Sequence, residues 1–165
     1  MLSGDPSTFA IWCDSVDSWS NEKFNNGCFG YIISGAFIWS TRSTLGDDLA
    51  GLCGLSCMSN SAEDGVLFEM SGSESYAELY KRAYPEMESG AENNDFRHVA
   101  APMSLLDEGY TIFLVESGEQ GRLLYGRDGM ENFIGEVLLR RGEFQAVVRE
   151  ADGRFTKWGA LAVRI

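Results

Sequence analysis

The chain has 165 residues, with 25 acidic and 13 basic side chains and a formal net charge of -12. Its apolar content of 44% is sufficient for a hydrophobic core, which excludes a chain that is disordered throughout. The negative charge argues against nucleic acid or an anionic membrane as the main partner, because both require Lys and Arg. We expect a single acidic globular domain over residues 1–165.

The amino-terminal segment has no basic residue before Lys23, so it does not have the form of a secretory signal. The longest apolar runs, such as residues 110–115, are far shorter than the roughly 20 residues that cross a bilayer. We therefore expect a cytoplasmic protein that does not enter a membrane. In that compartment thiols stay reduced, and we interpret the four cysteines as small buried apolar side chains: Cys13, Cys28, Cys53 and Cys57.

The first forty residues predict three antiparallel strands. Residues 9–16 are rich in aromatic and β-branched side chains and begin just after a turn signal at Pro6. After a polar break at 18–27, residues 28–33 and 36–39 flank Ser34-Gly35, which is typical of a two-residue hairpin turn. The pattern predicts a β-meander over about residues 6–40.

The middle of the chain predicts two helices and a loop. Large apolar side chains recur at helical intervals over about residues 44–58, at Leu45, Leu49, Leu52, Leu55 and Met58. A second helix is predicted over about 73–84 and stops at Pro85. The stretch 86–95 has no basic residue and little to bury, and it is predicted to be an exposed loop.

The remainder of the chain predicts a second meander over about residues 109–140, followed by an amphipathic helix over about 143–152 that closes near Gly153. The predicted fold class is therefore α+β, with a single domain in which two antiparallel meanders pack with two or three helices.

The acidity is concentrated in one half of the chain. Residues 1–95 carry 15 acidic and 4 basic side chains, whereas residues 96–165 carry 10 and 9. Between Arg42 and Lys81 there are seven acidic residues and no basic one. Such a stretch repels itself unless a partner or counterions supply positive charge. Two interpretations stay open, a solvated surface that maintains solubility and a surface that binds a basic protein.

Catalytic and metal-binding motifs are weak. His98 is the single histidine, and no Gly-x-Ser-x-Gly elbow accompanies it. Cys53 and Cys57 lie four residues apart and with Cys13 and Cys28 provide four thiols, but the paired knuckles of a zinc site are missing. We assign no catalytic, cofactor-binding or metal-binding residue and expect no cofactor.

Aromatic side chains crowd the first meander, at Trp12, Trp19, Phe24, Phe29, Tyr31, Phe37 and Trp39. A strand has two faces, so these rings cannot all point into one core unless both faces of the sheet are covered. Most are expected in the core, and some are candidate interface anchors, because Trp and Tyr are enriched at binding hot spots. Trp19, in the polar break, is the leading exposed candidate.

The opening of the chain resembles the immunity protein family numbered forty-two of bacterial polymorphic toxin systems. The resemblance rests on Gly4-Asp5-Pro6, Phe9, Ile11, Asp14-Ser15-Val16, Trp19, Asn26-Gly27-Cys28-Phe29 and Ser34-Gly35-Ala36-Phe37, and more weakly on residues 110–124. It implies a small cytoplasmic protein without enzymatic activity that binds the C-terminal domain of a cognate toxin and blocks it.

A toxin that must hold phosphate is often basic, so an acidic surface is able to occupy its active site. The toxin is then expected to be a cytoplasm-acting nuclease or another basic toxin, and a toxin that attacks nucleotides or a protein fits nearly as well. The candidate toxin-binding residues are Asp47, Asp48, Glu63 and Asp64, with Glu86, Glu88 and Glu92 as an acidic flank and Trp19 as an anchor.

Two other classes of function stay open. A small hydrolase or metal-dependent enzyme requires Asp14, Asp17, Asp95 and His98 to converge. An acidic adaptor module instead binds a housekeeping protein.

Overall fold

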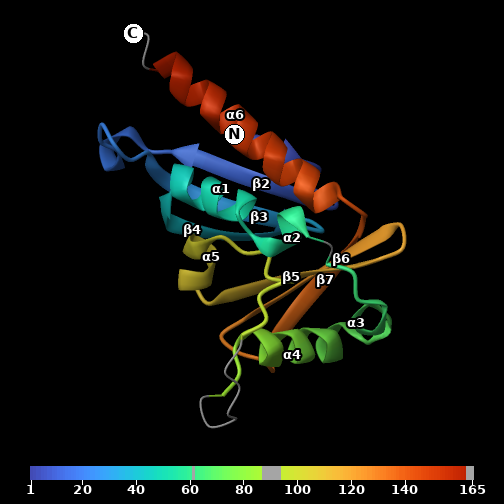
Figure 1. Cartoon of the computed structure of the whole chain (residues 1–165). Helices are drawn as coiled ribbons and strands as arrows, with labels where there is room; N and C mark the ends of the chain where they lie inside the picture. Colours follow the sequence, from blue (N-terminus) through green and yellow to red (C-terminus); the bar gives the residue numbers. More distant parts are fainter. Residues whose placement is uncertain (61, 87–93, 163–165) are drawn as a thin grey trace.

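The computed structural model describes residues 1–60, 62–86 and 94–162, and the side chains of residues 158–162 are left out of the description (Figure 1). In chain order its elements are β1 (Leu2–Gly4), β2 (Phe9–Ser15), the 3-10 turn η1 (Asp17–Trp19), β3 (Asn26–Ile33), β4 (Ala36–Thr44), α1 (Leu45–Cys53), α2 (Ser56–Ser59), α3 (Gly65–Glu69), α4 (Gly72–Ala83), α5 (Met103–Asp107), β5 (Tyr110–Ser117), β6 (Gln120–Arg127), β7 (Phe133–Arg140) and α6 (Glu143–Ala162).

The first sheet, sheet A, has the antiparallel order β1-β2-β3-β4. Ser34 and Gly35 join β3 to β4 with φ of 49° and 81°, the left-handed values of a tight hairpin turn. The predicted first meander is confirmed. The sequence did not predict β1, a strand of three residues that forms by pairing Leu2 with Trp12.

The second sheet, sheet B, has the antiparallel order β5-β6-β7. Ser117 pairs with Gln120 across a turn in which Gly118 has φ of +56°, and Gln120 pairs with Arg140 on β7. The predicted second meander is confirmed.

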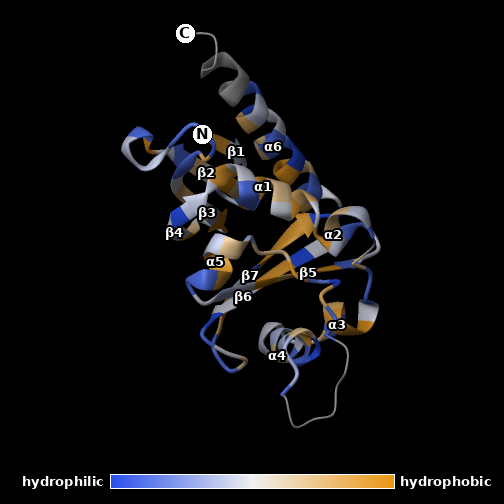
Figure 2. Cartoon of the chain, turned by 60° about the vertical axis from the view of Figure 1, so that its left-hand side comes forward, coloured by the Kyte–Doolittle hydropathy of each residue, from blue (hydrophilic) through white to orange (hydrophobic). Residues whose placement is uncertain are grey.

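The sheets and helices form layers around two groups of buried side chains. The larger group joins one face of sheet A to α1, α5, α6 and one face of sheet B, through residues such as Tyr31, Leu49, Leu114 and Phe144. The smaller group joins the opposite face of sheet B to α3 and α4. Figure 2 shows the hydrophobic colour concentrated where these layers meet. The structure thus confirms the α+β class.

The helix predicted over 44–58 is interrupted. α1 ends at Cys53, with Gly54 as its C-cap, and α2 begins at Ser56 because Leu55 adopts an extended backbone with ψ of 148°. The predicted helix over 73–84 is confirmed as α4, which begins one residue earlier behind a reciprocal cap between Ser71 and Glu74. The short helices α3 and α5 were not predicted.

The prediction that the last helix closes near Gly153 is wrong, since α6 continues to Ala162. A helical glycine costs about 1 kcal/mol relative to alanine. Phe155 lies beyond that glycine and packs against the larger core, with its ring next to Gly46 of α1. This tertiary contact supports the helix through the weak position.

Candidate functional site

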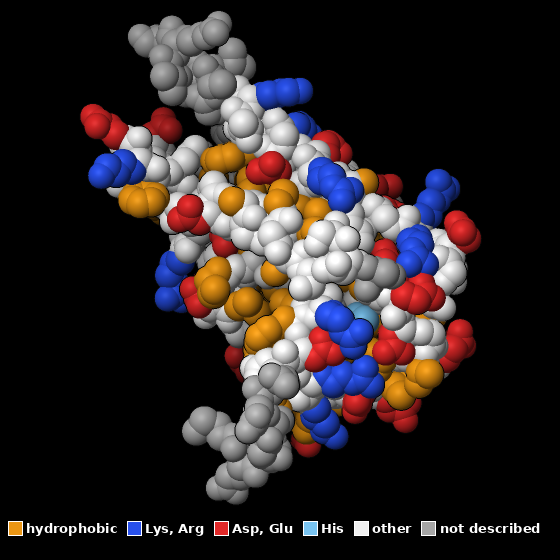
Figure 3. Space-filling view, in the orientation of Figure 1, with side chains coloured by type: hydrophobic (Ala, Val, Ile, Leu, Met, Phe, Trp, Pro, Cys, Tyr) orange, Lys and Arg blue, Asp and Glu red, His pale blue; other side chains and the backbone are white. Residues whose placement is uncertain are grey.

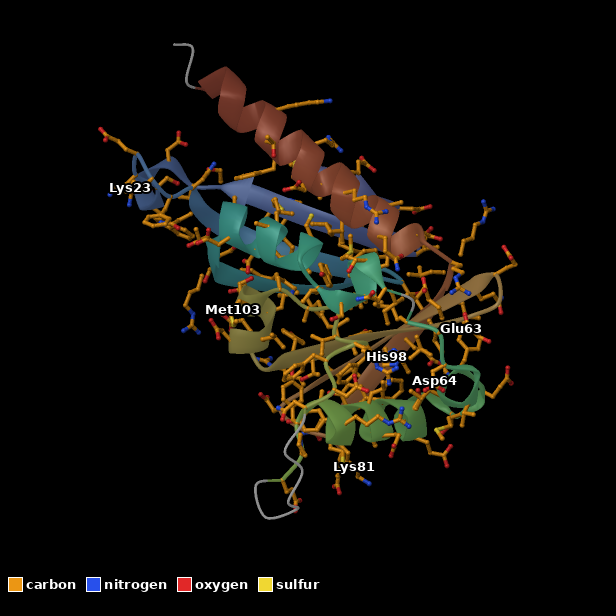
Figure 4. The ribbon with its side chains drawn as sticks, in the orientation of Figure 1. Lys23, Glu63, Asp64, Lys81, His98 and Met103 are labelled. Carbon is orange, nitrogen blue, oxygen red and sulfur yellow. The ribbon has the colours of Figure 1, made fainter. Side chains whose placement is uncertain are left out.

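The four groups required for a hydrolytic site do not converge. His98 is 3% exposed, and its Nδ1 lies 2.8 Å from the carbonyl oxygen of Leu114 in sheet B. Burial lowers the pKa of His98, which favours the neutral ring. Asp95 is near this histidine, whereas Asp14 and Asp17 belong to the end of sheet A that carries Lys23 in Figure 4.

Asp95 is instead held by Arg97. The guanidinium donates to both carboxylate oxygens, at 2.8 Å from Nη2 and 3.0 Å from Nε. This hydrogen bonding lowers the pKa of Asp95 to about 2, so the carboxylate stays charged and paired. An acid in this state is a poor proton donor or acceptor near neutral pH.

The cysteines divide into two kinds. Cys13 and Cys57 are buried in the core as predicted, and the Cys57 thiol donates to the carbonyl of Val99 over 3.2 Å. Cys28 is half-buried and Cys53 is exposed, so the prediction that all four are buried is wrong for these two. Within the described part of the chain, no group of three or more His, Cys, Asp or Glu side chains is placed to hold a metal ion.

Asp48 lies inside the protein, although the sequence placed it in the candidate binding set. Its side chain is 5% exposed and accepts hydrogen bonds from the Ser43 hydroxyl at 2.5 Å and the Ser104 backbone amide at 3.1 Å. The carboxylate therefore joins β4, α1 and the start of α5. A surface contact from this residue would require the fold to open.

Glu63 and Asp64 have basic partners within the chain. Asp64 accepts from the Leu67 backbone amide at 3.0 Å, which caps α3, and from Arg82 at 3.3 Å. Glu63 pairs with Arg141 at 2.5 Å. The local sequence shows no base near these acids, and their partners come from α4 and from the β7–α6 connection. Figure 4 places Glu63 and Asp64 together beside sheet B.

The acidic flank is described only in part. Glu86 is exposed just beyond α4, whereas Glu88 and Glu92 lie outside the described residues.

Asp47 and Trp19 are brought to the same end of sheet A. The Leu45 amide donates to the carbonyl of Asn25 at 2.9 Å, and the Thr44 hydroxyl donates to the Asn26 side chain at 3.0 Å. These bonds hold the start of α1 against the connection between β2 and β3. Asp47 and Trp19 are both exposed there.

Three further exposed acids lie at the same end, and we call the set of Asp14, Asp17, Glu22 and Asp47 the acidic end of sheet A. The described structure places no Lys or Arg nitrogen within 4.0 Å of any of these four carboxylates. Figure 3 shows red acidic side chains around the projecting tip that carries Lys23 in Figure 4. Sequence reasoning did not include Asp14, Asp17 and Glu22 among the candidate toxin-binding residues.

The aromatic side chains of sheet A divide between its two faces. The expectation that most of the seven rings lie in the core is wrong, because only Phe29 and Tyr31 are fully buried there. Phe37 and Trp39 are 46% and 49% exposed on the face that points away from the core, and Trp19 is 48% exposed at the acidic end. Alternation along β4 is the signal that separates the faces, because Ile38 between the two exposed rings is buried.

The model of the family described as immunity protein 42 matches residues 1–154. The chain belongs to the immunity protein 42 family. It is therefore an immunity protein that protects against a toxin used in competition between bacteria.

A solved structure supports this assignment of the immunity protein. The crystal structure of CdiI from Burkholderia dolosa AUO158 superposes with a TM-score of 0.89 and is 54% identical in sequence. The match covers 93% of this immunity protein and 99% of the CdiI chain. A comparison with curated proteins gives no match. None of the helices in the described part of the immunity protein is long and apolar enough to span a bilayer.

Proposed function

We propose that this immunity protein binds the C-terminal domain of its cognate toxin and blocks the toxin's active site with an acidic surface. The observation that carries the proposal is the acidic end of sheet A, where four exposed carboxylates have no Lys or Arg nitrogen within 4.0 Å in the described part of the chain. In this proposal neutralisation takes place in the cytoplasm by stoichiometric binding. The separation of Asp14 and Asp17 from His98 favours binding over hydrolysis.

The toxin that fits such a surface is a basic one, such as a nuclease. A nuclease holds phosphate with Lys and Arg, and carboxylates occupy the same positive groove in place of the substrate. Complementary charge also raises the rate at which two proteins meet, which matters when an inhibitor must reach a toxin quickly. The net charge of -12 acts in this direction over the whole molecule.

We rank the candidate contact residues by their exposure and by the partners that they have within the chain. Asp47 and Trp19 are exposed and adjacent to further acids, so they lead the set. Glu63 is paired with Arg141 and Asp64 with Arg82, so each acid would have to give up its own arginine to bind a toxin side chain. The loss of that ion pair reduces the binding free energy gained from either contact. Glu86 lies in a separate place beyond α4, and the buried Asp48 supports Asp47 through the position of α1.

The test compares growth and binding with the toxin domain encoded beside this protein. Cells that express the toxin domain should grow only when the immunity protein is present, and calorimetry should show tight binding that weakens as salt is raised. No rescue and no heat of binding would overturn the proposed function for that pair.

A matched pair of variants tests the acidic surface itself. The triple variant Asp17→Asn, Glu22→Gln, Asp47→Asn should slow association about tenfold and flatten its dependence on salt. The control Glu69→Gln, Glu119→Gln, Glu131→Gln changes the net charge equally, at exposed positions on α3 and the turns of sheet B. Equal slowing by both variants would contradict a localised acidic contact and leave only a general effect of net charge.

A further inference from the structure

The outer face of sheet A, which points away from the core, is apolar although no helix in the described part of the chain covers it. Residues that alternate outward along the strands include Trp12 on β2, Ile32 on β3, and Phe37 and Trp39 on β4, with Leu2 on β1. None of these five side chains belongs to either core group. The solvent face of an antiparallel sheet is ordinarily polar, so an apolar outer face requires another explanation.

Every helix that packs on sheet A does so on the opposite face. In the described structure the buried helical side chains of the core group that sheet A shares are Leu45, Leu49 and Leu52 of α1, Cys57 and Met58 of α2, Leu105 of α5, and Phe144, Val147, Val148 and Ala151 of α6. Figures 1 and 2 both place α1 and α6 on one side of sheet A. The outer face is therefore left to solvent or to a partner.

The rings on this face form an ordered cluster. Phe37 and Trp39 stack with an interplanar angle of 1° and centroids 6.2 Å apart, and Trp12 meets Phe37 edge-on at 5.4 Å. Gly30 lies between Trp12 and Trp39 in the strand register, and a Cβ there would lie 2.6 Å from Cε2 of Phe37. Phe37 thus rests over a position without a side chain. Rings fixed in this way lose little conformational entropy when a partner covers them.

The charge beside the rings identifies the chemistry of the occupant. Asp14 follows Trp12 by two residues on β2 and points outward on the same face, and the acidic end of sheet A continues from it. Residues 2–44, which span sheet A, carry four acidic residues and two basic ones, Lys23 and Arg42, and Arg42 pairs with Glu108 at 3.4 Å. The surface thus combines an aromatic centre with negative charge at the end of the sheet that holds Asp14, Asp17 and Glu22. A second copy of this chain carries the same charge of -12, which opposes self-association.

We infer that the outer face of sheet A, centred on Trp12, Phe37 and Trp39, is the docking surface for an apolar patch on the toxin domain that is bordered by Lys and Arg. This inference rests on the proposed function and adds the position of the interface. The rings supply buried area at the centre, and Asp14 with the acidic end supplies charge pairing at the rim.

The first test is a pair of polar substitutions with a matched control. Phe37→Thr and Trp39→Thr together place a β-branched residue, which suits a strand, at two exposed positions, and they should raise the dissociation constant for the toxin domain at least 100-fold. Leu138→Thr on β7 alters a side chain that is 57% exposed on the other sheet, and it should change the constant less than threefold. Circular dichroism and thermal melting verify that all the variants are folded.

A second measurement uses the native protein. Cys28 lies on the outer face, paired in register with Asp14, whereas Cys53 lies at the end of α1 on the other side of the sheet. Bound toxin should protect Cys28 from N-ethylmaleimide and leave the rate at Cys53 unchanged, as read by peptide mass spectrometry.

The outcomes separate this inference from the proposed function. Tight toxin binding that persists within threefold in the Phe37→Thr, Trp39→Thr variant would overturn the docking surface and leave the proposed function intact. Failure of the native protein to bind the toxin domain would overturn both. A native dimer in sedimentation experiments that becomes monomeric in the variant would show that a second copy covers the face, which also overturns the inference.

Discussion

The backbone amide of Ser104 donates a hydrogen bond to Oδ1 of Asp48 over 3.1 Å, and this bond joins two residues that are 56 positions apart. The same carboxylate accepts from the Ser43 hydroxyl. One buried acid therefore fixes the ends of three elements, next to an exposed acid, Asp47, that has no such role.

The effects of substituting Asp48 and Asp47 on stability should therefore differ. Asp48→Ala should lower the free energy of unfolding by about 3 kcal/mol, because it leaves buried donors unsatisfied. Asp47→Ala should stay within about 0.5 kcal/mol of the native protein. Urea denaturation measures both. Equal destabilisation by the two substitutions would contradict the role assigned to Asp48.

His98 should make the stability of the protein depend on pH. Burial lowers the pKa of His98 in the folded state below the ordinary value of 6.5. The nearby charge of Arg97 lowers this pKa further, whereas the charges of Asp64 and Asp95 raise it. The unfolded chain then binds the proton more tightly than the folded protein. Stability should be complete above pH 7 and should fall as the pH drops through 6.5 toward 5.

The measurement is the free energy of unfolding in urea at pH 7.5, 6.5 and 5.5. His98 is the single histidine, so His98→Asn should remove this slope even though it lowers stability overall. Asp95 titrates in the folded protein at about 2 and does not contribute in this range. A slope that survives in the variant would assign the effect to another group.

The cysteines should react in two classes. Burial raises the pKa of Cys13 and of Cys57 to about 12, so neither thiol forms the reactive thiolate in the folded protein. N-ethylmaleimide should modify Cys53 first and Cys28 more slowly, and all four thiols only in urea. Cys53→Ser should remove the fastest phase, and modification of Cys13 at a similar rate in the folded state would contradict the described burial.

Arg122 should be a second stability centre. It is 7% exposed, and its Nη1 donates to the carbonyls of Phe68 at 2.8 Å and Met70 at 2.7 Å, while its Nε donates to Glu136 at 2.6 Å. Arg122→Ala should cost about 3 kcal/mol, since it leaves a charged partner and two carbonyls without a donor.

The control for this substitution is Arg127→Ala on the same strand. Arg127 is exposed and lies over the Tyr110 ring at 4.9 Å, so its loss should cost less than about 1 kcal/mol. Thermal melts of both variants compare them directly. A larger shift for Arg127→Ala would show that the contacts of Arg122 are not the ones that hold α3 and α4 to sheet B.

The parts of the fold that the sequence predicted are those with local causes. The turn at Ser34-Gly35 and the stop at Pro85 depend on neighbouring residues, and both elements formed as predicted. The extension of α6 past Gly153 depends on Phe155 meeting α1, which lies about a hundred residues earlier in the chain. Phe155 is in phase with the apolar stripe of residues 144–151, but the stripe does not show which element this side chain meets.

The candidate site shows the same limit. Exposure of Trp19 followed from its place in a polar break, whereas the burial of Asp48 depends on Ser104. Glu63 and Asp64 looked unpaired because Arg141 and Arg82 are distant in sequence. The alternation of side chains along β4 predicts that Phe37 and Trp39 share one face of the strand. It does not predict that this face is exposed, because that depends on the helices covering only the other side of the sheet.

The outer face of sheet A also gives the protein an intrinsic optical signal. Trp12 and Trp39 lie on that face and Trp19 lies at its acidic end, so three of the four tryptophans report on one surface. With Trp158→Phe in place, the emission spectrum arises from these three indoles alone. A blue shift on mixing would then register the covering of this surface without any attached dye, and the purified protein would serve as its own titration probe.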